Sequence, residues 1–381
     1  MKRSALIIFA IACLASSVRA DEAGWVSLYN GKDLSNWVNV NCAPETWTAQ
    51  GDVIHCTGRP TGALRTPRQY ENFILELDWR HLKPAGNSGV FIWGSAIAAP
   101  GVPFLRAIEV QVLDNAFNIR GKNQWYTTHG DVFPIHGSSM KPIHKGDGMR
   151  CFPSEERSKS SPEWNHYRIV GNDGKLRLSV NGKEVSGGND VVWRKGYLAL
   201  ESEGSPVEFR NIRLQELPPS GVIPEDSAPV DEGWKPLYNG LDFRGWAIDA
   251  RGRKRWATRD WRLVCQRSAS VLETEKAYAD FELTVDVKSA EKSKEAVRPR
   301  IVLAAHDGAE SVLLSNRPNE WTRNYLHVHG KAVALVDREG RPKSPPVPLR
   351  SAGPWKIGLE GAGAAIEFGN IYLRKAHGPA R

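Results

Sequence analysis

The stretch GWVSLYNGKDLSNW (residues 24–37) decides the organisation of this chain, because it returns as GWKPLYNGLDFRGW at residues 233–246. The two stretches are identical at eight of fourteen positions. A repeat over this distance indicates two copies of one structural unit. The same offset of 209 residues relates two further pairs, Trp47 with Trp256 and Cys56 with Cys265.

A second repeated stretch marks the other end of the unit. LESEGSPVEFRNIRL (residues 200–214) returns as LEGAGAAIEFGNIYL at residues 359–373. The offset has fallen from 209 to 159, so the second copy lacks about fifty residues from its middle. The proline-rich segment 218–231 has the composition of a stiff linker. We therefore predict one domain at residues 21–217 and a second, degenerate one at residues 232–377.

The pattern within each unit is that of β-strands. Residues 73–79 (FILELDW) alternate between apolar and polar side chains, which predicts a strand with one buried face. Asn181 and Gly182 supply the positive-φ residues of a type I′ hairpin turn. The chain also has 35 Gly and 24 Pro, so we predict an all-β fold of two-sheet sandwiches. Strict alternation through residues 207–214 would place one set on a shared face: Val207, Phe209, Asn211 and Arg213.

The first twenty residues have the features of a secretory signal peptide. Lys2 and Arg3 precede an apolar run at residues 5–15 that is too short to span a bilayer. We predict cleavage after Ala20 and a secreted or periplasmic protein, with an uncleaved anchor as the alternative. No later segment resembles a membrane span.

The charge balance indicates no nucleic-acid partner. Lys and Arg number 51 against 43 Asp and Glu, and the excess is spread along the chain. The one dense basic run, residues 251–255, is interpreted as a solvated loop, because nucleic-acid binding needs a basic stripe or a recognised motif. The pattern does not indicate an oligomeric state.

Four cysteines lie beyond the predicted signal peptide, and an exported protein meets conditions that permit disulfides. Cys42 and Cys56 flank one predicted hairpin and form the most plausible pair, although free buried thiols fit the sequence as well. No Cys or Cys/His spacing indicates structural zinc.

The most informative candidate for a site is the segment AIEVQVLD (residues 107–114). As a strand it places Glu109 and Gln111 on one face and apolar side chains on the other. This pattern fits a polar groove, but an ordinary half-exposed strand would show the same alternation of polar and apolar residues. Asp114 follows directly and is a further candidate.

Upstream, GNSGVFIW (residues 86–93) combines glycines with aromatic residues. Alternation places Gly89, Phe91 and Trp93 on one face, and Asn87 joins them. An aromatic ring such as that of Trp93 could stack on a sugar, although core packing is the commoner role of a Trp.

The region 115–162 lacks a clear strand pattern and is rich in Gly and Pro. It holds several groups that could bind a metal or act as acid and base. Their spacing matches no metal motif, so they could equally satisfy loop backbone. These groups are His129, Asp131, His136, His144 and Asp147.

The repeat serves as an internal control on the polar candidates. Glu201 is kept in the second copy as Glu360, but Glu203 becomes Ala362 and Arg210 becomes Gly369. A copy that keeps its scaffold and loses polar groups has the character of a non-catalytic one. Glu203 and Arg210 are therefore candidates for function, with a structural ion pair as the alternative.

The first unit resembles the 3-keto-disaccharide hydrolase family. The resemblance rests on the opening stretch, GNSGVFIW, AIEVQVLD, EWNHYRIV (residues 163–170), VNGKEV and GYLALESEGSPVEFRNIRL, and covers residues 24–217. It implies an exported protein with two concanavalin-like jelly-roll β-sandwich domains in tandem. Many members have Gln and His where this chain has Glu201 and Glu203, which bears on specificity and activity.

The resemblance implies hydrolase or lyase chemistry on a 3-keto-glycoside. A base removes the acidic C2 proton next to the ketone, the C1 leaving group departs, and water adds to the product. This differs from the paired-carboxylate displacement of ordinary glycosidases. A divalent metal could supply the electrophile near the C3 oxygen.

We accordingly assign roles to the candidates. Glu109, His129 and Glu203 are the predicted catalytic residues, with Glu109 and His129 also the predicted metal ligands. The predicted substrate-binding residues are Asn87, Trp93, Gln111, Asp114, Glu201 and Arg210. A non-catalytic carbohydrate-binding module and a structural cell-surface domain are the competing functions, because fold alone does not set function.

Overall fold

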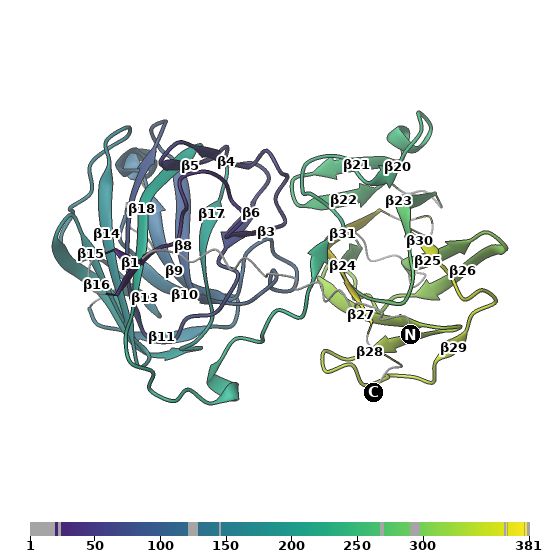
Figure 1. The fold of residues 1–381 in the computed structure, drawn as a ribbon. Helices are drawn as coiled ribbons and strands as arrows, with labels where there is room; N and C mark the ends of the chain where they lie inside the picture. Colours follow the sequence, from purple (N-terminus) through teal and green to yellow (C-terminus); the bar gives the residue numbers. More distant parts are fainter. Residues whose placement is uncertain are drawn as a thin grey trace, which may run out of the picture.

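Two β-sandwich domains lie side by side in the computed structural model, the first purple to teal and the second green to yellow (Figure 1). The structure describes residues 20–21, 24–120, 129–144, 146–266, 270–289, 298–361, 363, 365–376 and 378. The predicted signal peptide therefore lies outside the described residues, apart from Ala20. No helix among the described residues is long and apolar enough to cross a membrane.

The front sheet of the first domain carries the predicted site. Its strand order is β12-β13-β10-β9-β8-β17-β6-β3, all antiparallel. In that order the strands span Gly146–Asp147, Arg150–Cys151, Val132–Ile135, Ala107–Leu113, Asn87–Gly94, Tyr197–Ser202, Gly62–Arg65 and Val38–Val40.

The back sheet packs against it in the order β1-β2-β18-β7-β14-β15-β16-β11, with β5 paired to β18 and β4 to β5. The path strands span Ala20–Asp21, Trp25–Ser27, Val207–Glu216, Phe73–His81, Asn165–Asn172, Lys175–Val180, Lys183–Val192 and Ser139–Pro142. The two remaining strands are β4 (Trp47–Gln50) and β5 (Val53–Cys56). Short 3₁₀ helices occur at Asn115–Arg120, Pro224–Asp226 and Gly252–Lys254.

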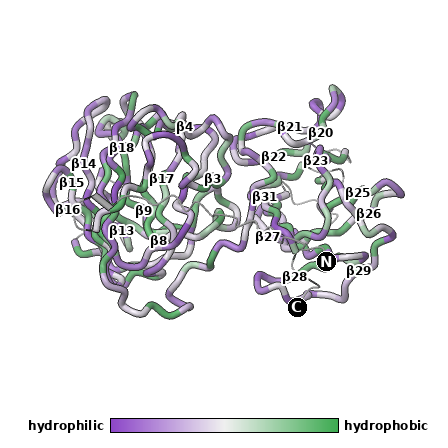
Figure 2. Tube along the Cα trace, in the orientation of Figure 1, coloured by the Kyte–Doolittle hydropathy of each residue, from purple (hydrophilic) through white to green (hydrophobic). Residues whose placement is uncertain are grey.

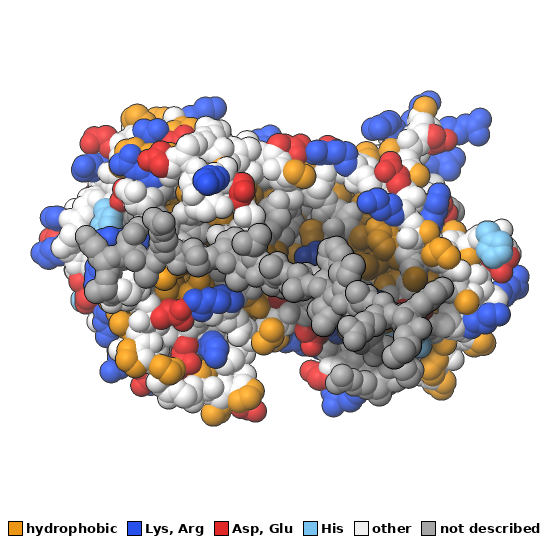
Figure 3. All heavy atoms as spheres, in the orientation of Figure 1, with side chains coloured by type: hydrophobic (Ala, Val, Ile, Leu, Met, Phe, Trp, Pro, Cys, Tyr) orange, Lys and Arg blue, Asp and Glu red, His pale blue; other side chains and the backbone are white. Residues whose placement is uncertain are grey.

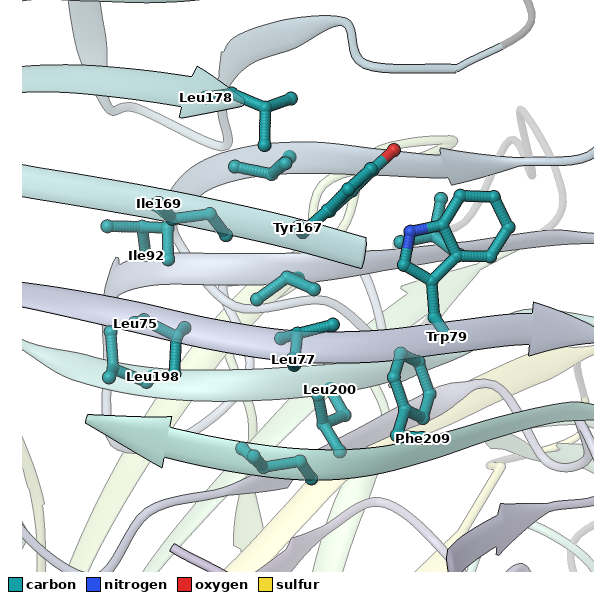
Figure 4. Close-up of a cluster of buried hydrophobic side chains, with 14 of the residues drawn as sticks. Leu75, Leu77, Trp79, Ile92, Tyr167, Ile169, Leu178, Leu198, Leu200 and Phe209 are labelled. Atoms are coloured by element: carbon teal, nitrogen blue, oxygen red, sulfur yellow. The ribbon is translucent and has the colours of Figure 1, made fainter. Parts of the chain in front are cut away.

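The core of the first domain lies between these sheets, as the alternation predicted. Figure 4 shows Leu75, Leu77 and Trp79 of β7 facing Leu198 and Leu200 of β17. All five side chains are buried. Because successive strand residues point to opposite faces, the intervening polar residues are directed out of the sandwich.

Strict alternation along β18 is wrong in its second half. Val207 and Phe209 are buried, but so are Ile212 and Leu214, which the pattern placed on the opposite face. A β-bulge between Arg210 and Arg213 changes the register, and Asn211 within it has a φ of 52°. One extra residue in a strand exchanges the two faces beyond it.

The second domain repeats the two-sheet plan. Its larger sheet has the order β21-β22-β31-β24-β27-β28-β29 with β19 beside β31, and its smaller sheet β20-β23-β30-β25-β26. The larger sheet comprises Trp256–Arg259, Arg262–Cys265, Ile366–Lys375, Phe281–Ser289, Thr322–His329, Ala332–Val336, Val347–Pro348 and Lys235–Pro236. The smaller sheet comprises Trp246–Ala247, Val271–Tyr278, Trp355–Glu360, Arg300–Ala305 and Gly308–Leu313.

Each domain has its own hydrophobic core. Figure 2 shows hydrophobic residues concentrated on the strands of both domains and hydrophilic residues along many of the turns. On the face drawn in Figure 3, acidic and basic side chains are interspersed over both domains.

The domains are joined by a buried interface. Tyr372 of β31 packs on the outer face of the front sheet against Phe91 and Ala199. Its hydroxyl donates to Oδ1 of Asn41 at 2.7 Å, and the backbone amide of Gly101 donates to Asp286 at 2.7 Å. The second domain thus covers part of the face on which the candidate site lies.

The predicted linker is packed on the first domain. Asp231 accepts a hydrogen bond from the buried Arg65 at 2.5 Å, and Gln69 donates to the carbonyl of Ala228 at 2.6 Å. The segment 218–231 is therefore held against the sandwich.

Cys42 and Cys56 are free thiols, so the disulfide predicted between them is not formed. Burial raises the pKa of both thiols, and the indole N–H of Trp47 lies 3.3 Å from Cys42 Sγ. Both thiols are therefore protonated members of the core.

Candidate functional site

Three acidic side chains meet on the outer face of the front sheet, as predicted for Glu109, Glu201 and Glu203. Gly89 of β8 pairs with Gln111 of β9, and the β8–β17 register that pairs Val90 with Leu200 brings Glu201 to the other side of Gly89. Glu109 pairs with Phe91, which lies two residues after Gly89 in β8. The alternation of β9 sends Glu109 and Gln111 outward because Ile108, Val110 and Val112 fill the core.

Gly89 provides the space into which two of these carboxyl groups project. A Cβ atom built on Gly89 would lie 2.8 Å from Glu201 Oε2 and 3.0 Å from Glu109 Oε1. The first contact is closer than real Cβ atoms show and the second is tighter than most, so a side chain at this position would have to displace one or both carboxyl groups.

A chain of hydrogen bonds joins the carboxyl group of Glu203 to Gln111 of β9. The Gln111 side-chain amide donates to Asn87 Oδ1 at 2.8 Å, and the Asn87 amide donates to Glu203 Oε2. Asn87 and Gln111 were predicted to bind substrate, and in the structure they orient Glu203.

The environment raises the pKa of Glu109 and Glu203. Burial is the main cause of the rise of the Glu109 pKa to about 8, and the charge of Glu203 adds to it while Arg150 opposes it. Burial likewise raises the pKa of Glu203 to about 7, against the hydrogen bond from Asn87. Two carboxyl groups with pKa values near neutrality can differ in protonation state at the same pH, so one can act as a base while the other acts as an acid.

Glu201 is the most buried of the three, at 1% exposure. Burial and the charges of Glu203 and Glu109 hold its pKa well above the usual range, so the group is protonated at neutral pH. Its Oε2 atom has no hydrogen-bond partner among the described residues. A protonated carboxyl group in this position can donate to an oxygen that gains negative charge.

Arg150, which was not among the residues predicted from the sequence, lies on the β10 side of the three carboxyl groups. Its guanidinium forms an ion pair with the buried Asp131 at 2.8 Å and lies 3.3 Å from the centre of the Phe133 ring. Phe133 pairs with Glu109 across β9 and β10, which explains the effect of Arg150 on the Glu109 pKa. Arg150 lay in a region with no strand pattern, so no sequence signal pointed to it.

Trp93 is not a stacking platform, and that prediction is wrong. Its φ of 52° and the register shift between β8 and β17 turn the side chain into the core. There it packs edge-on to Phe73 with ring centroids 5.9 Å apart, and its indole N–H donates to the carbonyl of Glu71 at 2.8 Å.

His129 is held by backbone. Its Nε2 atom lies 3.0 Å from the amide nitrogen of Arg157 and 3.3 Å from that of Ser158. Burial lowers the pKa of His129 to about 4, so the imidazole is neutral and accepts these bonds. That nitrogen is not free to bind a metal together with Glu109, and the residue serves the loop, as the alternative interpretation held.

Asp114 is buried, and its hydrogen bonds join three segments of the chain. Its Oδ1 atom accepts from the amides of Ala85 and Ala116, both at 2.9 Å, and its Oδ2 atom accepts from Ser161 at 2.7 Å. These bonds give Asp114 a structural role at this end of the sandwich.

Arg210 lies on the outer face of the back sheet, so the prediction that it binds substrate together with Glu201 and Glu203 is wrong. Phe209 points into the core and Arg210 away from it. Arg210 forms an ion pair with Asp78 at 3.3 Å and stacks on Trp164. This is the structural ion pair named as the alternative.

The remaining acid–base candidates are dispersed. His136 stacks on Phe104 with ring centroids 5.8 Å apart, whereas His144 and Asp147 are exposed. Among the described residues no three His, Cys, Asp or Glu side chains are arranged to hold a metal ion. The described residues therefore do not fit the predicted Glu109–His129 metal site.

Comparisons with known proteins place the first domain in a family. Residues 24–215 match the family described as 3-keto-alpha-glucoside-1,2-lyase-like domain. A 3-keto-disaccharide hydrolase of Bacteroides thetaiotaomicron is 23% identical over 235 residues, which cover 52% of this chain and 80% of that protein.

Solved structures similar to this chain include carbohydrate-active proteins. A candidate glycosyl hydrolase of Parabacteroides distasonis is 22% identical with a TM-score of 0.41, covering 51% of this chain and 94% of that one. A carbohydrate-binding module of Bacillus subtilis, CBM66, is 12% identical with a TM-score of 0.34, covering 48% and 96%.

Proposed function

Because the chain belongs to the 3-keto-alpha-glucoside-1,2-lyase-like family, we propose that its first domain cleaves 3-keto-glucosides by elimination followed by hydration. The coarser assignment, a glycoside-hydrolase-like carbohydrate-processing protein, follows from the family and the similar hydrolase. The single observation that carries the finer proposal is the meeting of three carboxyl groups around Gly89.

The reaction requires one base and one acid. The base takes the C2 proton, the C2–H electron pair forms an enolate with the C3 ketone, and collapse of the enolate breaks the C1–O bond. The acid supplies the proton that the departing oxygen needs. Water then adds across the C1–C2 double bond of the 2-hydroxy-3-keto-glucal, which gives the free 3-keto sugar.

In this proposal the Glu109–Glu203 pair supplies both groups. Near neutral pH one member of the pair is ionised and removes the C2 proton, while the other is protonated and serves the leaving oxygen. Protonated Glu201 donates to the C3 oxygen as the enolate forms, which stabilises the charge where it develops.

The Glu109→Gln variant tests the proposal directly. We expect turnover of 3-keto-trehalose or 3-keto-lactose to fall by at least about a hundredfold, since general acid–base catalysis contributes that much. Glu184→Gln, on the exposed β15–β16 hairpin, removes the same charge and should leave turnover unchanged. Unchanged turnover in Glu109→Gln would remove Glu109 from the site.

The alternative is a carbohydrate-binding module without chemistry. It is favoured by the departure at Glu201 and Glu203 from the Gln and His of many relatives. Binding of unoxidised glycans with no cleavage of either 3-keto-disaccharide would establish it and refute the enzyme.

Metal dependence and export belong to the same proposal as separate predictions. No step above uses a metal, and assays with and without a chelator decide whether a divalent ion takes part. Export rests on the N-terminal segment, and the N-terminal sequence of protein recovered outside the cytoplasm tests cleavage after Ala20.

A further inference from the structure

A cavity lies between the two domains, apart from the three carboxyl groups around Gly89. Its volume is about 370 Å³. The first domain contributes Arg106, His136 and Trp193, the segment after it contributes Glu232, and the second domain contributes Arg323, Arg338 and Arg374. We call it the interdomain cavity, and it exists only while the domains are docked.

Two of the four lining arginines are neutralised by carboxylates. Arg323 forms two hydrogen bonds with Asp286, at 2.6 and 2.9 Å. Arg374 pairs with Glu282 at 2.5 Å and with Glu232. These ion pairs lie within the second domain and the segment just before it, and Arg374 is shared by two carboxylates, so Glu232 adds negative charge to the lining.

Arg106 and Arg338 have no carboxylate partner among the described residues. The Nε atom of Arg106 is buried without a hydrogen-bond partner, and its guanidinium stacks 3.8 Å from the centre of the Trp193 ring. Arg106 and Arg338 both line the cavity, and burial together with the charge of Arg338 lowers the pKa of Arg106, so two positive charges without a carboxylate partner share this space. Such a pair is stabilised when an anion binds between them.

The rest of the lining suits a ligand with a less polar body. Trp193 is 7% exposed, and Ala96, Ile97 and Pro229 add apolar surface. Burial lowers the pKa of His136, so its imidazole is neutral and adds no charge. A cationic end and an apolar wall match a sugar ring that bears an acidic group.

We propose that the interdomain cavity binds an acidic saccharide, with its carboxylate or sulfate oxygens between Arg106 and Arg338. The two arginines alone support the inference of an oxyanion, whereas the inference of a sugar ring depends on the proposed function of the first domain. This role gives the second domain a purpose beyond packing, because it supplies Arg338.

Titration calorimetry on the full chain tests the proposal with four probes: D-glucuronate, glucose 6-sulfate, glucose and inorganic sulfate. We expect one of the sugar acids to bind more tightly than inorganic sulfate, and glucose not to bind. Arg338→Gln should weaken the binding about tenfold, and Arg106→Gln with Arg338→Gln should abolish it. Binding should also weaken as the salt concentration rises.

Two matched variants make the result specific. Arg251→Gln removes the same charge from an exposed loop and should leave binding unchanged. Glu109→Gln should abolish turnover and keep the binding, which separates a failure here from a failure of the proposed catalytic site.

The proposal is overturned if neither sugar acid binds, or if Arg338→Gln, a change on an exposed loop, leaves their affinity unchanged. Inorganic sulfate that binds as tightly as the sugar acids would overturn the saccharide part. Turnover of 3-keto-trehalose by Arg338→Gln should match that of the unaltered protein.

Discussion

The geometry of the candidate site depends on Gly89 having no side chain. Glu109 Oε1 and Glu201 Oε2 both lie within 3.0 Å of the point where a Cβ atom would be. Burial of these carboxyl groups, together with their mutual repulsion, favours their protonated forms. A single glycine thus sets both the space and the electrostatics of the candidate site.

The Gly89→Ala substitution should therefore abolish turnover of a 3-keto-disaccharide. Its methyl group must displace Glu109 or Glu201, and overpacking of this kind costs about 1–3 kcal/mol of stability. Steady-state kinetics together with thermal unfolding check the prediction. Full activity in a folded variant would show that the two carboxyl groups need not share this space.

The raised pKa of Glu109 has a consequence for stability. A raised carboxyl pKa means that the folded protein holds a proton that the unfolded chain releases, so stability falls as the pH rises from the unfolded value toward about 8. We expect Glu109→Gln to become more stable than the unaltered protein at pH 8 by an amount on the order of a few kcal/mol. Urea unfolding at about pH 5 and pH 8 measures it, and equal pH dependence in both proteins would contradict the raised pKa.

At the scale of elements, the same bulge recurs in both domains. Asn211 of β18 and Asn370 of β31 have φ values of 52° and 47° and occupy matching places in the repeat. Each donates to an aspartate of the neighbouring strand at 2.7 Å, Asn211 to Asp78 and Asn370 to Asp286. Beyond the bulge, the residues that would point outward point inward in both copies. Strict alternation therefore placed Ile212 on the wrong face.

The two asparagines form a matched pair of tests. Asn370 is buried and also donates to the carbonyl of Val102 at 2.8 Å, whereas Asn211 is exposed. Asn370→Ala should destabilise the protein by about 2–3 kcal/mol and Asn211→Ala by about 1 kcal/mol, because buried groups left unpaired cost more. Chemical unfolding compares them, and equal losses would show that the interface bonds of Asn370 add nothing.

At the scale of the whole molecule, the second domain covers an apolar part of the front sheet. Phe91, Ala107 and Ala199 are buried together with Tyr372. Without the second domain these side chains would form an exposed patch beside the three carboxyl groups, and such patches promote association. The interface therefore has a role in solubility as well as in shaping the interdomain cavity.

Residues 21–217 expressed without residues 232–377 should consequently self-associate. Light scattering against concentration measures this, with the full chain as reference. Replacing Phe91 with Ser in the shortened chain should restore a monodisperse species. A shortened chain that is already monodisperse at high concentration would contradict the role assigned to the interface.

Local pattern sufficed for the strands, the hairpin at Asn181 and the shared face of Glu109 and Gln111, because a period of two fixes which face a side chain takes. The same rule failed at Trp93 and Arg210. A positive-φ residue reverses the face of Trp93, and alternation cannot tell which of the two sheets displays Arg210. Asn and Trp at such positions carry no local sign of the bulge.

By itself the sequence determined the all-β class, the repeat and the carboxyl groups of the front strands, since these depend on neighbours along the chain. The tertiary structure alone decided that His129 serves a loop, that Arg150 lies beside the three carboxyl groups, and that Arg106 meets Arg338 across two domains. The last of these relations joins residues more than two hundred positions apart in the sequence. Their burial and charge exist only once the sheets and domains have packed.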